Sequence, residues 1–310
     1  MINCFPSLAQ QVINVEEKVE GNIHLAEGIS IPKINPGYTL WAPETGEVKG
    51  LIVFTRSRRD TINSDVLIDE ALKNHLAVLY ATTDNRLEFF FETSRMQEIE
   101  KYIFQAVSQL DIPKQNILFC GMSLEGTRAL KLATFSQSEV AKYHLKPMAI
   151  AICDAPLDMI RFHKEMVKAK TLEFHASATN EGYWVSSYLE KNLGGTPEDN
   201  LEAYIQYSPY NYLNDGGPNV EALSEISIRA YTEPDVQWWM ETRRKDYYAM
   251  NSIDLAALIN TLNIKGNSNA ELILTENKGY LWDGRRHPHS WSIVDEPEMI
   301  QWFLKLIGEK

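Results

Sequence analysis

The sequence predicts an α/β fold with a mostly parallel central sheet of about eight strands, helices on both faces of that sheet, and a helical insertion. Short apolar runs of strand length alternate along the chain with segments in which apolar residues recur at helical spacing. Several of these runs are apolar throughout, as strands buried on both faces should be. We expect residues 1–310 to form a single domain, because α/β folds of this length often form one unit.

The first half of the chain begins with short strand-like segments, after which predicted strands and helices alternate. Proline and glycine separate Ile23–Ile29 from Tyr38–Trp41, which suits an antiparallel opening. We expect Ser64 to cap the first helix, and Ser94 with Gln97 to form a capping box at the start of the second. The alternation predicts strands at Gly50–Thr55, His75–Tyr80 and Asn116–Cys120, and helices over Asp65–Leu76, Met96–Leu110 and Leu124–Phe135.

The second half continues the alternation around one different segment. Residues 156–224 are rich in aromatic side chains, glycine and proline, and we expect them to form a helical lid folded over one edge of the sheet. The remaining elements are strands at Pro147–Cys153, Ile226–Tyr231 and Ala270–Thr275 and a closing helix near Pro297–Ile307.

Composition excludes several classes of partner. The net charge of −12 and pI of about 5.1 argue against nucleic acid and against an anionic membrane surface, since both are bound by clustered lysine and arginine. No apolar run is long enough to span a membrane. Three cysteines form no disulfide framework, and we expect Cys120 and Cys153 to be buried thiols. We therefore expect a cytoplasmic protein, with secretion left open if a signal peptide has been removed.

One motif carries chemistry. An apolar strand runs directly into Gly121-Met122-Ser123-Leu124-Glu125-Gly126, and a helix follows. A serine in a tight turn between a strand and a helix has the context of a nucleophile elbow, in which a strained backbone lifts the hydroxyl above the sheet. In this motif, and in the order of elements from about residue 38 to residue 307, the chain resembles the α/β-hydrolase family. The family's usual pattern is G-x-S-x-G; here Glu125 occupies the fifth position and glycine follows at Gly126.

The resemblance implies a nucleophile, an acid and a base in that order along the chain. It makes Ser123 the nucleophile and places the acid after a later strand, where we assign Asp235. Glu233 competes with Asp235 for this role, and Asp246 and Asp254 are weaker candidates. Asp235 is equally suited to cap the helix that we expect over Val236–Tyr248.

The base is expected between the last strand and the closing helix. Two histidines lie there, and we assign His289, which Ser290 and Trp291 follow as small and aromatic residues often do in the family. His287 is the alternative; it precedes Pro288, whose ring restricts the backbone of His287 to extended conformations.

The resemblance also implies an oxyanion hole made of backbone N–H groups. One is expected from Leu124, and the second from the loop after Gly50–Thr55, where Arg56 or Ser57 can donate. Arg58 of the same loop, with its arginine neighbours, could bind an anionic part of a substrate or instead pair with nearby acidic residues.

Aromatic residues of the insertion, together with Trp238 and Trp239, suit the wall of a small-molecule pocket and suit lid packing equally well. The histidines have no metal-ligand spacing, and we expect no metal and no cofactor. The predicted function is hydrolysis of a small carboxylic ester, thioester or amide through an acyl-enzyme. The alternatives are a non-catalytic binding or scaffold protein on the same fold, or a peptidase or acyltransferase. The sequence leaves the oligomeric state open.

Overall fold

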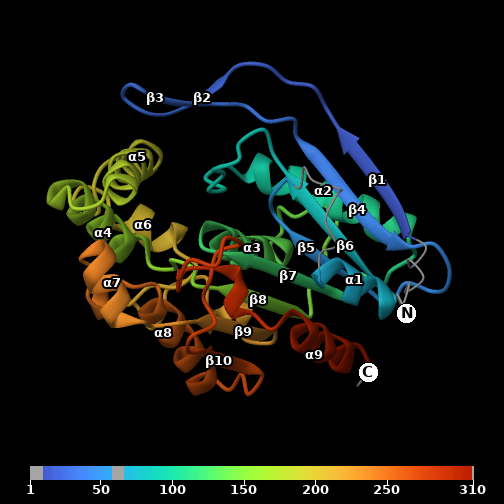
Figure 1. Cartoon of the computed structure of the whole chain (residues 1–310). Coiled ribbons are helices and arrows are strands. Elements are labelled where there is room, and N and C mark those ends of the chain that lie inside the picture. Colours follow the sequence, from blue (N-terminus) through green and yellow to red (C-terminus); the bar gives the residue numbers. More distant parts are fainter. Residues whose placement is uncertain (1–9, 58–65, 309–310) are drawn as a thin grey trace.

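The computed structural model describes residues 10–57 and 66–308 and centres on an eight-stranded sheet (Figure 1). The strands lie in the order β1-β4-β6-β5-β7-β8-β9-β10. A separate antiparallel hairpin pairs β2 with β3. The strand bounds are β1 Gln10–Glu16, β2 Asn22–Ala26, β3 Ile29–Pro32, β4 Gly37–Pro43, β5 Gly50–Phe54, β6 Leu76–Thr82, β7 Ile117–Met122, β8 Ala149–Cys153, β9 Ser227–Thr232 and β10 Ala270–Leu274.

The sheet is parallel except at one end. β1 and β4 pair antiparallel, as do β4 and β6, whereas all pairs from β6 to β10 are parallel. Every residue of β5, β6 and β8 is buried, which fits their continuously apolar sequences. The predicted antiparallel opening and mostly parallel sheet of about eight strands are confirmed.

Helices cover both faces of this sheet, as predicted. One hydrophobic cluster packs α2, α3 and α8 against one face, and a second packs α1 and α9 against the other. The helix bounds are α1 Val66–Lys73, α2 Thr93–Gln109, α3 Leu124–Ser136, α4 Met159–Leu172, α5 Ala176–Leu193, α6 Leu201–Tyr207, α7 Val236–Arg243, α8 Ser252–Ile264 and α9 Glu296–Gly308, with short 3-10 turns η1 Glu221–Leu223, η2 Tyr247–Ala249 and η3 Trp291–Ile293.

Some local predictions were wrong. The Ser94–Gln97 capping box does not form, because α2 begins at Thr93 and its N-cap is Glu92, two residues before Ser94. The Ser94 hydroxyl donates to Glu92 and the Gln97 amide to the Val140 carbonyl. The helix after Asp235 ends at Arg243, whereas we expected it to continue to Tyr248. The sequence did not predict β1 or α8. The predicted cap Ser64 lies outside the described residues.

The range 156–224 folds into α4, α5, α6 and η1, as the prediction of a helical insertion requires. Helices α4, α5 and α6 form a third hydrophobic cluster with the β2–β3 hairpin, where Leu25 and Ile31 pack near Tyr188 and Leu189 (Figure 1). Leu223 of η1 belongs to the first cluster. The role of this segment as a lid remains a prediction.

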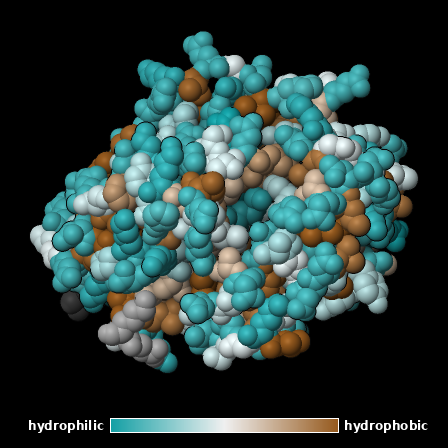
Figure 2. Space-filling model, turned by 180° about the vertical axis from the view of Figure 1, so that it is seen from behind, coloured by the Kyte–Doolittle hydropathy of each residue, from teal (hydrophilic) through white to brown (hydrophobic). Residues whose placement is uncertain are grey.

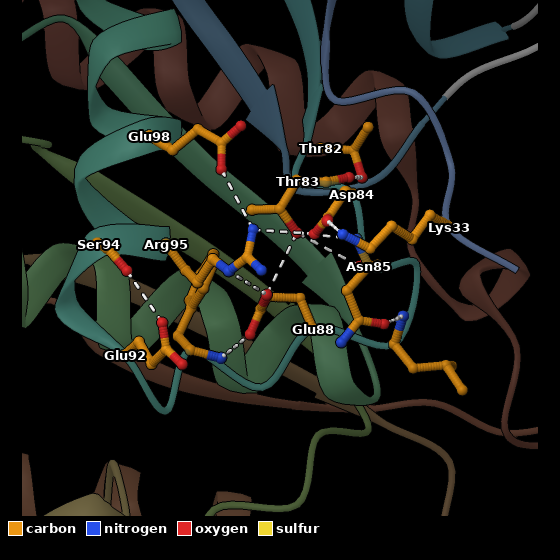
Figure 3. Close-up of polar contacts among 12 residues, drawn as sticks. Lys33, Thr82, Thr83, Asp84, Asn85, Glu88, Glu92, Ser94, Arg95 and Glu98 are labelled. Carbon is orange, nitrogen blue, oxygen red and sulfur yellow. Dashed lines mark hydrogen bonds and ion pairs between the residues drawn. The ribbon is translucent and has the colours of Figure 1, made fainter. Parts of the chain in front are cut away.

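A polar network anchors the hairpin to the sheet (Figure 3). Lys33, just after β3, pairs at 2.8 Å with Asp84, which follows β6. Arg95 of α2 reaches the same carboxylate at 2.9 Å and lies 3.7 Å from Glu88 and from Glu98. The network therefore joins the hairpin, the carboxyl end of β6 and α2 through a carboxylate with little access to water.

The face opposite the view of Figure 1 is mainly hydrophilic, with hydrophobic residues scattered in small groups (Figure 2). Such small exposed groups are ordinary on folded proteins. Among the described residues, none of the helices has the length and apolar character needed to cross a bilayer.

We predict that Asp84→Asn lowers the free energy of unfolding by about 1–3 kcal/mol, because it removes a nearly buried charge between Lys33 and Arg95. Glu98→Gln is the matched control: its side chain is 25% exposed against 9% for Asp84, and it lies 3.7 Å from Arg95. We expect the control to change the unfolding free energy by less than about 0.5 kcal/mol. Urea denaturation measures both, and equal effects would contradict this assignment.

Candidate functional site

Ser123 lies in the turn between β7 and α3 with a strained backbone. Its φ of 54° falls in the left-handed region that side chains other than glycine rarely adopt. Its N–H donates to the Cys153 carbonyl of β8 at 2.8 Å, and its carbonyl accepts the N–H of Gly126 at 2.9 Å. These bonds hold the serine at the carboxyl edge of the sheet, directly before the amino end of α3.

Two glycines make this turn sterically feasible. A Cβ on Gly121 would lie 2.3 Å from the backbone of Glu125, and a Cβ on Gly126 would lie 2.7 Å from the Cβ of Ala155. Gly126 is therefore the glycine that lets α3 approach the end of β8. The neighbouring Glu125 points elsewhere: its carboxylate lies 3.8 Å from Arg56 and 3.9 Å from Arg128.

His289 contacts a carboxylate that is not among the predicted acids. Its Nδ1 makes a short hydrogen bond with Oδ2 of Asp154, the residue directly after β8. Asp154 is 4% exposed, and its other carboxylate oxygen accepts a bond from Thr232 at 3.2 Å. Because an ionised carboxylate only accepts, Nδ1 of His289 is the donor, which leaves Nε2 able to accept a proton.

Asp235 does not reach His289. One of its oxygens caps α7 through the Trp238 N–H at 3.0 Å, and the other pairs with Arg286 at 2.8 Å. Glu233, the competing candidate, also pairs with Arg286 and accepts the N–H groups of Lys278 and Gly279. Both acids therefore hold the segment that carries His289, and the assignment of Asp235 as the carboxylate bonded to the imidazole must be corrected to Asp154.

The weaker acid candidates have other partners. Asp254 is fully buried and pairs with Arg161 at 2.5 Å. Asp246 caps η2 through the Ala249 N–H and lies 3.6 Å from Lys168.

Ser123, Asp154 and His289 line one cavity of about 130 Å³. The cavity also borders on four chain segments: α4, α5, α7 and the turns that follow α7. The remaining lining residues are Phe162, Met166, Ser177, Ala178, Glu181, Trp239, Arg243, Lys245, Ala249, Met250, Asn251 and His287. The structure thus brings the predicted serine and histidine to one cavity, beside a carboxylate that orients the histidine.

The other predicted site residues are divided between the cavity and its surroundings. Trp239 lines the cavity with its ring centroid 6.2 Å from that of His289, whereas Trp238 packs on His287 at 5.1 Å. Leu124 is the first residue of α3, where a helix leaves its N–H groups without helical partners. The guanidinium carbon of Arg56 lies 5.1 Å from the centre of the Phe54 ring. Arg58 lies outside the described residues.

His287, the alternative base, is fixed by its neighbour. Its Nδ1 donates to the His289 carbonyl at 2.7 Å, and its ring lines the cavity. Burial lowers the pKa of His287 below its ordinary value, and the charges of His289 and Arg243 act in the same direction. His287 is therefore a neutral imidazole in the folded protein at neutral pH.

The two cysteines in the described part of the chain contribute no exposed thiol. Cys120 and Cys153 are both buried and free, as predicted, and burial raises the pKa of each thiol well above its ordinary value. Within residues 10–57 and 66–308, no group of three or more histidine, cysteine, aspartate or glutamate side chains is placed to hold a metal ion.

No protein-family model and no curated protein sequence matches the chain. Solved structures do match. Prolyl oligopeptidase B from Galerina marginata has a TM-score of 0.57 at 10% identity, over 96% of this chain and 37% of that one. An esterase from the archaeon Pyrobaculum calidifontis has a TM-score of 0.53 at 12% identity, over 98% and 84% of the two chains.

Carboxyl esterase 2 from Tuber melanosporum is similar to the same degree, with a TM-score of 0.54 at 14% identity over 99% of this chain and 86% of that one. The chain spans most of the length of these esterases but little more than a third of the oligopeptidase. Together with the sheet order, these matches show that the chain has the α/β-hydrolase fold.

We predict that Gly126→Ala destabilises the protein by about 1–3 kcal/mol, because overpacking outweighs the roughly 0.5–1 kcal/mol that alanine ordinarily gains in a helix. The added methyl group would meet Ala155 at 2.7 Å. Gly308→Ala is the control, since a Cβ there meets no atom within 4 Å. Chemical denaturation measures both variants. A Gly126→Ala variant as stable as the wild type would show that α3 can move away from β8.

A second prediction concerns the stability of the protein at low pH. In the unfolded chain a histidine titrates near a pKa of about 6.5, and in the folded protein the pKa of His287 is lower. Below pH ~6.5 the unfolded state therefore binds a proton that the folded state excludes, and stability falls as the pH drops. His287→Asn keeps a donor near the His289 carbonyl and removes this loss. We expect its unfolding free energy to fall less steeply than that of the wild type between pH 7 and 5; parallel slopes would contradict the prediction.

Proposed function

We propose that this protein is a serine hydrolase that cleaves small carboxylic esters, thioesters or amides, with Ser123 as the nucleophile, His289 as the base and Asp154 as the acid that orients it. The observation that carries the proposal is the meeting of a strained serine turn and a carboxylate-bound histidine at one cavity. The esterases and the peptidase among the structural matches support a hydrolytic reaction on this fold.

Each group has a defined role in this reaction. Nε2 of His289 accepts the Ser123 proton as the hydroxyl attacks the substrate carbonyl, and Asp154 stabilises the imidazolium that forms. The imidazolium then protonates the leaving group, and an acyl-serine remains. Water attacks this acyl group with His289 again acting as base, so that the carboxylic acid is released and Ser123 is restored.

The developing oxyanion is stabilised by the N–H of Leu124 at the amino end of α3, where the helix dipole adds positive potential. The second donor in this proposal is the N–H of Arg56 or Ser57 after β5. β5 is the neighbour of β7 in the sheet, which supports this placement.

Labelling with a fluorophosphonate probe tests the proposal directly. We expect the wild type to be modified at Ser123, with the label found on the peptide that contains this residue. Ser123→Ala should remove the label and the hydrolysis of short acyl esters together. A protein that neither labels nor turns over such esters would instead be a binding protein on this fold.

Substitution of Asp154 and of Asp235 tests which aspartate orients His289. We predict that Asp154→Asn lowers kcat/KM about 10³–10⁴-fold, because an amide cannot hold His289 in the productive tautomer. Asp235→Asn, which weakens the contact with Arg286, should cost at most about tenfold through looser positioning of His289. Steady-state hydrolysis of a short aryl ester measures both. The reverse order of effects would restore Asp235 as the acid.

A further inference from the structure

Two cations border the cavity, and neither forms an ion pair with any residue that the structure describes. Arg243 at the end of α7 and Lys245 two residues later both line it together with Ser123 and His289. Among the described residues, no carboxylate lies within 4.0 Å of either charged group. Elsewhere in the same half of the chain, Arg161 and Arg286 are both paired with buried or half-buried carboxylates.

Both cations are partly withdrawn from water. Nη1 of Arg243 is buried and has no hydrogen-bond partner in the described part of the chain. Burial lowers the pKa of both groups, and for each of them it is the largest cause. The Lys245 ammonium lies 5.4 Å from the centre of the Trp239 ring, and the Arg243 guanidinium 5.8 Å from that of Trp238. A buried guanidinium N–H without an acceptor is costly, and a carboxylate oxygen would supply a charged acceptor.

The acidic residues nearby do not supply that anion. Glu181 on α5 also lines the cavity and acts on both cations electrostatically, but its side chain is exposed and forms no ion pair with them. Glu165 and Asp154 act electrostatically on Lys245 but not on Arg243, and Glu165 lies 4.0 Å from Lys168. Asp154 is bonded to His289 and Thr232.

We propose that Arg243 and Lys245 bind a carboxylate of the substrate, so that the protein acts on small esters or amides that carry one negative charge near the scissile bond. This inference rests on the proposed function of Ser123. The planar guanidinium of Arg243 provides two parallel N–H groups for a carboxylate, and Lys245 adds a second charge. The cavity of about 130 Å³ is well below the roughly 300–1,000 Å³ of drug-sized ligand pockets, so the charged substrate is short.

Isosteric ester pairs test the charge preference. Monoethyl adipate and ethyl adipamate differ only in the carboxylate or amide at the acyl end, and 4-acetoxybenzoate and 4-acetoxybenzamide differ in the same way at the leaving group. We expect the wild type to favour the anion of at least one pair in kcat/KM, and Arg243→Gln to lower that preference roughly tenfold or more. Lys245→Met should lower it in the same direction.

Arg244→Gln is the matched control, because Arg244 is exposed, stacks on Phe174 at 4.6 Å and does not line the cavity. We expect it to leave the charge preference unchanged. The inference is overturned if the wild type favours the anion of neither pair, or if Arg243→Gln slows anionic and neutral esters equally. Thermal melting of Arg243→Gln and of the charge-retaining Arg243→Lys confirms that the variants are folded.

A binding experiment separates this inference from the proposed function. In a Ser123→Ala background, isothermal titration with the preferred anionic ester and its amide isostere measures recognition without turnover. Arg243-dependent binding of the anion with no fluorophosphonate label on the wild type would retain the anion site and reject the hydrolase. A labelled, active protein whose binding ignores the charge would retain the hydrolase and reject the anion site.

Discussion

The hydrogen bond between Asp154 and His289 connects two parts of the chain that are 135 residues apart, and the geometry of the site depends on it. It can form because β8 lies beside β7, so that the residue after β8 emerges next to Ser123. Asp154 itself has a φ of 44°, a conformation that costs of order 1 kcal/mol or more. Its N–H bond to Tyr231 and the bond from Asn251 to its carbonyl help to offset that cost.

The two strained turns at the ends of β7 and β8 support one another. The Ser123 N–H bonds to the last residue of β8, and Gly126 allows α3 to lie against Ala155 just beyond Asp154. The histidine segment is held from the other side, because Glu233 and Asp235 both pair with Arg286. The acids after β9 therefore act on the position of His289 through a guanidinium, and no proton transfer needs to pass through them.

Hydrophobic patterning was sufficient to predict the layers of the fold, because buried parallel strands are apolar throughout and the helices between them have one apolar stripe. It was not sufficient for Asp154. The order of strands in the sheet comes from packing between distant segments. The assignment of Asp235 follows the family's order of residues along the chain, which does not say which strand end lies beside His289. A signal was present: Asp154 follows five apolar residues directly, and a charge there must lie at the carboxyl edge of the sheet. The structure also explains why Glu125 can replace the family's glycine: the close approach of α3 to the end of β8 occurs at Gly126, so of these two positions only that one requires glycine.

The cavity is lined by two cations, Arg243 and Lys245, in a molecule with an excess of acidic residues. Acidic residues outnumber basic ones, 42 to 30, so an unpaired arginine is not explained by a shortage of carboxylates. Buried Arg128 is bound by the Thr55 hydroxyl and the Glu88 carbonyl, and Arg161 by Asp254. An unsatisfied N–H of the kind that Arg243 carries costs about 1–3 kcal/mol. Nη1 of Arg161 lacks a partner as well, but that guanidinium is paired with Asp254, whereas Arg243 forms no ion pair with any described residue and lies at the cavity that Ser123 lines. A carboxylate bound at Arg243 recovers the free energy of its unsatisfied N–H.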